Sequence, residues 1–206
     1  MIMKEKELTA AESLKLIERT IEQSRRDVAK ASAQPLLVWG GLVLSTSLII
    51  WLLITNTPNG EGGGRWHLLW ILMTLIGGIY QYYFNRSWSV PDTIVSRTIG
   101  YMWGVFGISV FVLWAIDICA ITFGEISVRQ VIPMTPTIIL LMGLSVAVTG
   151  LMMNRLFISI IGAVACAICA YFSLVNQGVN ELLCIAVTAV FTLIVPGLYL
   201  KFSNGR

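Results

Sequence analysis

Few side chains in this sequence could do chemistry, and the first of them is Asp117, the only acidic residue inside a long apolar run. An ionisable group at membrane depth is costly and often functional, which makes Asp117 a candidate ligand-binding residue. A structural role is the alternative interpretation. In that case Asp117 lies near the lipid headgroups and pairs with Arg65, His67 or Arg129, which fall toward the same side of the membrane.

A second group of polar candidates lies in two other apolar runs. Gln81 is in one of them, and Thr188 and Thr192 share a helical face with Pro196 in the other. Proline cannot donate the amide hydrogen bond that the carbonyl of Thr192 would accept, so a hydroxyl group or a water must replace it. One interpretation is a polar-lined pocket in which Gln81, Thr188 and Thr192 bind a ligand. The other is that the threonine hydroxyls bond to their own helix backbone.

The remaining motifs with a chemical meaning are incomplete. Cys166 and Cys169 have the spacing of a redox or zinc pair, but an apolar helix offers neither the exposed, electropositive setting that activates thiolates nor a second pair of ligands. The glycine-rich stretch 59–65 lacks the Lys-Ser/Thr ending of a phosphate loop. His67 is the single histidine and cannot form a catalytic dyad by itself. We therefore predict no metal, no cofactor and no enzymatic activity.

The elements that must position these side chains are membrane helices. Hydrophobic residues make up 56% of the chain and charged residues only 12%, with a mean hydropathy of +0.80. A run of about 20 apolar residues spans the bilayer core as a helix. Six such runs are present, at residues 36–55, 67–84, 99–121, 136–153, 156–175 and 182–200. The predicted fold is an all-α, polytopic transmembrane bundle of six helices, preceded by a cytoplasmic amphipathic helix.

Basic residues predict the orientation of this bundle, because the cytoplasmic segments of membrane proteins are enriched in Lys and Arg. On one side, the ends of the spans carry Arg25, Arg26, Lys30, Arg86, Arg97, Arg155, Lys201 and Arg206. On the other side they carry only Arg65 and Arg129. We therefore predict a multi-pass protein with both termini in the cytoplasm and with the lipid bilayer as its immediate partner.

The first 34 residues form a separate, charged segment. They hold seven of the 14 Lys and Arg and six of the 11 Asp and Glu residues, and they lack the apolar core of a cleavable signal peptide. Thr9 followed by Glu12 has the capping-box spacing that starts a helix. Pro35 disfavours a helical conformation in the residue before it. The sequence predicts a helix that ends near Ala33, a bend at Pro35, and two domains, a cytoplasmic helix at 1–34 and a transmembrane domain at 35–206.

An apolar stripe runs along this first helix, because Leu14, Ile17, Ile21 and Val28 repeat at helical spacing with Ser24 as an interruption. The stripe must be covered by the protein's own bundle, by lipid headgroups, by a second copy or by another protein. A helix that lies on a membrane favours a basic polar face, whereas this one mixes both signs of charge. The pattern favours protein contact, and we assign the four apolar residues to partner binding, in a homo-oligomer or with a cytoplasmic protein.

Two further patterns concern how the spans are arranged. Trp39-Gly40 in the first span recurs as Trp103-Gly104 in the third, which predicts three successive helical hairpins related by an axis along the membrane normal. Small residues four positions apart predict where helices meet in lipid. These pairs are Gly41 and Ser45, Gly100 and Gly104, Gly143 and Ala147, and Ala163 and Ala167.

Four stretches of the chain carry a resemblance to other proteins: residues 12–17, the Trp39-Gly40 pair, the Gly-Tyr-Met-Trp-Gly of 100–104 and the Pro-Gly-Leu-Tyr-Leu-Lys of 196–201. They are similar to a group of uncharacterised bacterial membrane proteins of the kind found in Bacteroidota. The resemblance implies a charged N-terminal helix followed by six spans, and a place in the bacterial cytoplasmic (inner) membrane. It implies no reaction, ligand or catalytic residue.

Two classes of function fit these observations. The first is a non-enzymatic sensor, regulator or scaffold that acts through its cytoplasmic helix, and the second is a carrier or channel for a small solute or lipid. Ion-coupled carriers usually need carboxylates or broken helices near the middle of the membrane. Only Gln81 and Pro196 hint at such features, both toward the inner end. The sequence therefore favours the first class, and we expect no nucleic-acid partner.

Overall fold

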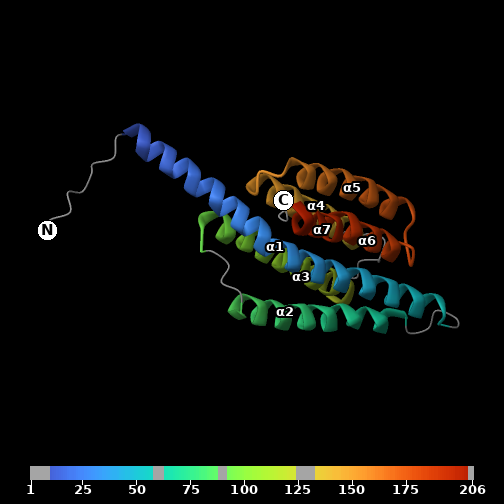
Figure 1. The fold of residues 1–206 in the computed structure, drawn as a ribbon. Coiled ribbons are helices and arrows are strands. Elements are labelled where there is room, and N and C mark those ends of the chain that lie inside the picture. The colour runs from blue at the N-terminus through green and yellow to red at the C-terminus, as the bar shows by residue number, and fades with distance from the viewer. Residues whose placement is uncertain (1–9, 58–62, 88–91, 124–132, 204–206) are drawn as a thin grey trace.

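The computed structural model describes residues 10–57, 63–87, 92–123 and 133–203, and within these ranges the chain forms helices and no strand. The all-α prediction is confirmed (Figure 1). In chain order the elements are α1 (Ala10–Thr55), the 3-10 helix η2 (Gly63–Leu68), α2 (Leu69–Ser87), α3 (Ile94–Phe123), α4 (Met134–Met152), α5 (Leu156–Val175), α6 (Glu181–Ala189), the π-helix η4 (Val190–Ile194) and α7 (Val195–Ser203).

Five helices of the described chain are long and apolar enough to cross a membrane. They are α1, α3 over Ile94–Ala120, α4, α5, and the continuous helix Glu181–Ser203 that contains α6, η4 and α7. Helix α2 also has 19 residues, but Gln81, Asn85 and Arg86 lower the hydropathy of its second half. Several long apolar helices of this kind fit a multi-pass membrane protein.

Helix α1 runs for 46 residues and contains Pro35, so the predicted helix end near Ala33 is wrong. Proline removes one backbone hydrogen bond and crowds the carbonyl four residues earlier. That carbonyl belongs to Ala31, and α1 nevertheless continues through the proline. Packing favours the helical conformation, because Ala33 and Leu36 beside the proline are both buried. One continuous helix therefore joins the expected segments 1–34 and 35–206.

Reciprocal capping of the expected kind is present at the start of α3. Thr93 Oγ1 accepts a hydrogen bond from the Ser96 amide at 3.2 Å, and Ser96 Oγ accepts one from the Thr93 amide at 3.1 Å. Arg97 adds two hydrogen bonds of 2.6 Å to the Asp92 carboxylate. Thr9, the capping residue predicted for α1, lies outside the described residues.

Glycines allow α4 and α5 to pack as a close antiparallel pair. A Cβ atom at Gly150 of α4 would lie 2.5 Å from Ser159 Oγ and 2.6 Å from the Ser159 amide nitrogen. The same serine hydroxyl donates a hydrogen bond of 2.7 Å to the carbonyl of Ala147 on the facing helix. Close backbone approach and interhelical hydrogen bonds of this kind stabilise helix pairs in lipid.

The predicted small-residue pairs identify helix contacts only in part. Gly143 packs against Cys166 as expected. At Gly41, Gly100 and Gly104, however, a Cβ would meet nothing within 4 Å, and Ala163 and Ala167 are exposed. The glycines that do lie against a neighbouring helix also include Gly40, Gly77, Gly150, Gly162 and Gly197. Gly40 and Gly104, which are equivalent in the expected hairpin repeat, thus have different surroundings.

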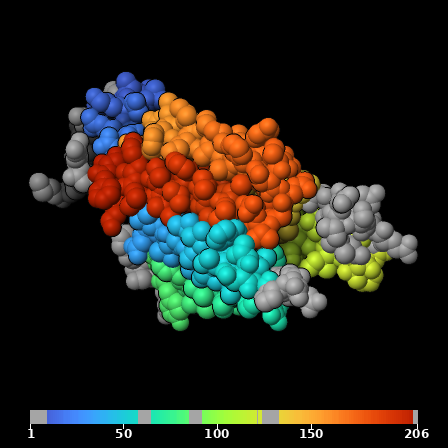
Figure 2. Space-filling view, turned by 90° about the vertical axis from the view of Figure 1, so that its right-hand side faces the viewer, coloured from blue at the N-terminus to red at the C-terminus, as the bar shows by residue number. Residues whose placement is uncertain are grey.

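Helix α1 lies in the middle of the bundle, between α2 on one side and the last helix on the other (Figures 1 and 2). A Cβ at Gly40 of α1 would lie 2.9 Å from Leu193 Cβ and 2.7 Å from Ile194 Cγ1, both in η4. On the opposite side, the indole of Trp39 occupies the space beside Gly77 of α2. Two buried apolar clusters hold these helices together, one toward each end of α1.

Candidate functional site

The first candidate site is the exposed stripe at the start of α1, where the helix extends beyond the rest of the bundle (Figure 1). Leu14, Ile17 and Ile21 are 68%, 55% and 46% exposed. We call these three residues the N-terminal stripe. The polar face of the same helix carries an ion pair at helical spacing, Arg26 Nε with Glu22 Oε1 at 3.4 Å. Because the pair is exposed, it contributes little to stability.

Val28, the fourth residue assigned to partner binding, does not belong to this surface. Its side chain is only 2% exposed, and it is part of the apolar cluster that includes Met153 and Leu200. Val28 is therefore not on the exposed part of the stripe. Helical spacing does not distinguish Val28 from Ile21, because both residues lie on the same face of α1. The difference is that the bundle covers Val28 and does not cover Ile21.

Gln81 bonds to α1 and does not face α6. Trp39 Nε1 donates a hydrogen bond of 3.4 Å to Gln81 Oε1, and the indole is seated against Gly77 on the same face of α2. The amide therefore satisfies a partly buried indole donor between two helices. This arrangement supports a packing role for Gln81.

Thr188 and Thr192 are fully buried and bond to their own helix. Thr188 Oγ1 donates to the carbonyl of Cys184 at 2.7 Å, and Thr192 Oγ1 donates to the carbonyl of Thr188 at 2.8 Å. Of the two interpretations of these threonines, the geometry fits the backbone bonding. Because α1 lies between α2 and the last helix, the structure does not bring Gln81 to the two threonines (Figure 1).

Asp117 is buried on the inward face of α3, with 9% of its surface exposed, and its Oδ1 atom has no hydrogen-bond partner among the described residues. Neither Arg65 nor His67 forms an ion pair with it, and the Arg65 guanidinium lies over the ring of Trp66 at 5.0 Å. Arg129, the third expected partner, is outside the described residues. The expected pairing is therefore absent for the two partners that the structure places.

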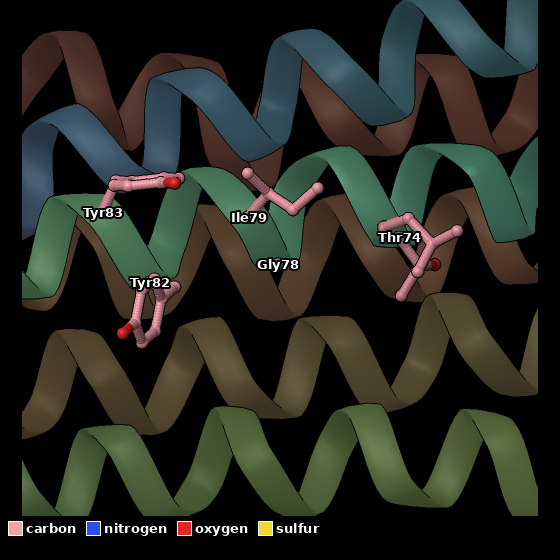
Figure 3. Close-up of a pocket in the computed structure, with 6 residues that line it drawn as sticks. Thr74, Gly78, Ile79, Tyr82 and Tyr83 are labelled. Atoms are coloured by element: carbon pink, nitrogen blue, oxygen red, sulfur yellow. The ribbon is translucent and has the colours of Figure 1, made fainter.

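A shallow hollow on α2 is formed by one helix alone. It is lined by Thr74, Leu75, Gly78, Ile79, Tyr82 and Tyr83. Figure 3 shows Thr74 toward one end and the two tyrosines toward the other, with Gly78 between them. The hollow exists because Gly78 has no side chain and no atom lies within 4 Å of the place where a Cβ would be. The Thr74 hydroxyl bonds to its own helix, at the carbonyl of Trp70, so this surface is essentially apolar.

A cleft at the far end of the bundle from the N-terminal stripe was not predicted. It has a volume of about 320 Å³ and is lined by Ile54, His67, Thr135, Gly178, Val179, Glu181 and Leu182, and we call it the distal cleft. These residues come from α1, η2, α4, α6 and the connection between α5 and α6. The local sequence signal is the spacing of Gly178 and Glu181, since Glu181 Oε1 accepts a hydrogen bond of 2.9 Å from the Gly178 amide.

His67 of the distal cleft should make the stability of the protein depend on pH. More than a third of the His67 surface is exposed to solvent, and the partial desolvation of its ring lowers the pKa of this imidazole below its usual 6.5. The unfolded chain then takes up a proton at a higher pH than the folded chain does. The free energy of unfolding should therefore fall as the pH drops from 6.5 toward the folded-state pKa, and level off below it.

Thermal unfolding in detergent between pH 7.5 and 5 tests this pH dependence, with His67→Gln as the matched variant because glutamine does not titrate. The midpoint of the wild-type protein should decrease more on acidification than that of the variant. Parallel curves for the two proteins would show that His67 is as accessible to protons in the folded chain as in the unfolded one.

Comparisons with known proteins identify no relative of this chain. No protein-family model, curated protein or solved structure matches it. The functional argument therefore rests on the surfaces described above.

Proposed function

We propose that this protein is a non-enzymatic sensor, regulator or scaffold of the bacterial inner membrane, and that it acts by binding a protein partner through the N-terminal stripe. The observation that carries the proposal is the exposure of Leu14, Ile17 and Ile21 on a helix that extends beyond the bundle. An amphipathic helix of this kind binds partners by placing residues at positions i, i+3 and i+7 into an apolar groove.

The charge of the same segment supports a protein partner over a lipid surface. Residues 10–27 carry four acidic and four basic side chains, whereas a helix that binds anionic lipid has a mostly basic polar face. The proposed topology has six spans, with α2 as the sixth, and both termini in the cytoplasm. The excess of basic residues at one end of the bundle supports this orientation. In this topology the stripe faces cytoplasmic proteins.

The proposal is tested by the double variant Ile17→Asp/Ile21→Asp in the full-length protein. Two charges on the stripe disfavour docking, so a photo-crosslinker placed at Ser13 should lose at least nine tenths of its protein crosslinks in native membranes. The matched control is Leu16→Asp/Gln23→Asp, which adds the same two charges to the opposite face of the helix. The control should crosslink as the wild type does.

Unfolding midpoints of both double variants complete the experiment. If Ile17→Asp/Ile21→Asp kept every crosslink and only unfolded more easily, the stripe would be a cover for the protein's own bundle and the proposed function would be wrong. The proposal would also fail if both double variants lost their crosslinks equally, because the effect would then come from added charge alone.

A further inference from the structure

The distal cleft combines an apolar floor with a single formal charge. Ile54, Val179 and Leu182 provide the apolar lining, Thr135 and His67 add polar groups, and Glu181 adds a carboxylate. Its volume of about 320 Å³ is at the lower end of the range of small-molecule sites, which are typically apolar with a few fixed polar groups. A small ligand with one polar end matches this lining.

The carboxylate of Glu181 is held in place by the backbone. The Gly178 amide donates a hydrogen bond of 2.9 Å to Glu181 Oε1, and Gly178 has a φ of 103°, a conformation that glycine adopts without strain. The carboxylate forms no ion pair with a basic side chain among the described residues, and the Arg65 guanidinium lies over the ring of Trp66 at 5.0 Å. Among the described residues, Glu181 therefore gives the cleft a negative potential.

From these observations we propose that the distal cleft binds a small organic cation, with the ammonium group at Glu181 and an apolar body against Ile54, Val179 and Leu182. This inference goes beyond the proposed function and does not rest on it, because binding requires no protein partner. A bare metal ion suits the cleft less well. Metal sites need three or more donor groups, and no cluster of three His, Cys, Asp or Glu side chains exists among the described residues.

His67 adds a condition to this binding. Partial desolvation lowers the pKa of its imidazole, so at neutral pH the uncharged ring predominates and can accept a hydrogen bond from an ammonium group. From the neighbouring elements the cleft is lined by uncharged Ile54 of α1 and Thr135 of α4 and by the Glu181 carboxylate of α6, and Arg65 is the other charged residue of η2 itself. Protonation of His67 at acidic pH would add a positive charge to the lining of the same cleft, so the affinity for a cation should fall on acidification.

Calorimetric titration of the full chain in lipid nanodiscs tests the proposal with two probes of the same shape, 2-phenylethylamine and 2-phenylethanol. At pH 7.5 the amine carries a positive charge and the alcohol does not. The amine should bind saturably and at least tenfold more tightly than the alcohol, and its affinity should fall at pH 5. Equal binding of the two probes, or an amine that does not saturate, would overturn the proposal because both indicate partition into lipid.

Two variants locate the site within the cleft. Glu181→Gln removes the charge but keeps an oxygen that can accept the Gly178 hydrogen bond, so it should fold normally and bind the amine at least tenfold more weakly. Thr135→Phe fills the cleft without a change of charge and should have the same effect. Retention of wild-type affinity by either variant contradicts the proposal.

The control is Asp92→Asn, which removes a carboxylate that is bonded to Arg97 at the opposite end of the bundle. This variant should bind the amine as the wild type does. A comparable loss of affinity in Asp92→Asn would mean that the amine responds to total charge and not to the cleft. The stripe variant Ile17→Asp/Ile21→Asp should also bind the amine normally, which separates this test from that of the proposed function.

Discussion

Replacing Gly150 by alanine should lower the free energy of unfolding by about 3 kcal/mol, because the new methyl group would have no space between α4 and α5. It would lie 2.5 Å from Ser159 Oγ and 2.6 Å from the Ser159 amide nitrogen. The hydroxyl cannot move aside without losing its 2.7 Å hydrogen bond to Ala147. The amide nitrogen is part of α5, so relief requires the two helices to separate.

Gly104→Ala is the matched control, because a Cβ at this position of α3 would meet no atom within 4 Å. In an exposed helix, alanine is favoured over glycine by up to about 1 kcal/mol, so this variant should be as stable as the wild type or more stable. The midpoints of denaturation by SDS in mixed micelles compare the three proteins. Similar losses at both positions would mean that α4 and α5 are not packed in close contact at Gly150.

Val28→Asp should have the second large effect, a loss of about 4 kcal/mol, whereas Ile21→Asp should change stability by less than about 1 kcal/mol. Val28 is 2% exposed within the apolar cluster, so a carboxylate there would be buried without a partner. Ile21 is 46% exposed on the N-terminal stripe, where water can solvate the charge. The two residues are two helical turns apart on the same face of α1.

The same denaturation assay measures this contrast, with Val28→Ala as a milder variant that removes apolar contact without adding charge. Val28→Ala should lose about 1 to 2 kcal/mol, from the buried methyl groups alone. If Val28→Asp were as stable as Ile21→Asp, α1 would leave the bundle at a later residue than the structure places it, and the stripe would extend to Val28.

The sequence predicts the helices well because the lipid environment leaves the chain few choices. Each of the six apolar runs falls largely within a helical segment, since unpaired backbone groups are costly in hydrocarbon and a helix satisfies them locally. Composition alone does not decide whether each of these helices spans the membrane. Helix α2 is as long as α4, yet Gln81 and its polar neighbours lower its hydropathy.

The contacts between helices were harder to predict, because they depend on how each helix is rotated. The pair Gly100 and Gly104 has the same spacing as Gly143 and Ala147, yet only Gly143 lies against another helix. Pro35 is a similar case. Its local effect disfavours the helix, but the packing of Ala33 and Leu36 that keeps α1 helical involves residues far away in the chain.

The distal cleft could not be predicted from periodicity at all. Its lining joins positions from Ile54 to Leu182, contributed by four elements and a connection. The two side chains of interest, His67 and Glu181, lie outside the middle of the apolar runs, where a search for membrane-embedded charge directs attention to Asp117 instead. Only the spacing of Gly178 and Glu181 marks the site locally, and such spacing is common in turns.

The continuity of α1 links the direction of the N-terminal stripe to the packing of the bundle. Leu14 and Ile54 are separated by about 60 Å at 1.5 Å per residue, roughly twice the thickness of the hydrocarbon core. The bundle holds α1 from Val28 to Ile50, both of which are buried, so only the segment before Val28 extends from it. A change of about 5° in the direction of that segment would carry Leu14 sideways by about 2 Å. The packing of α1 between α2 and the last helix therefore determines where the N-terminal stripe is presented.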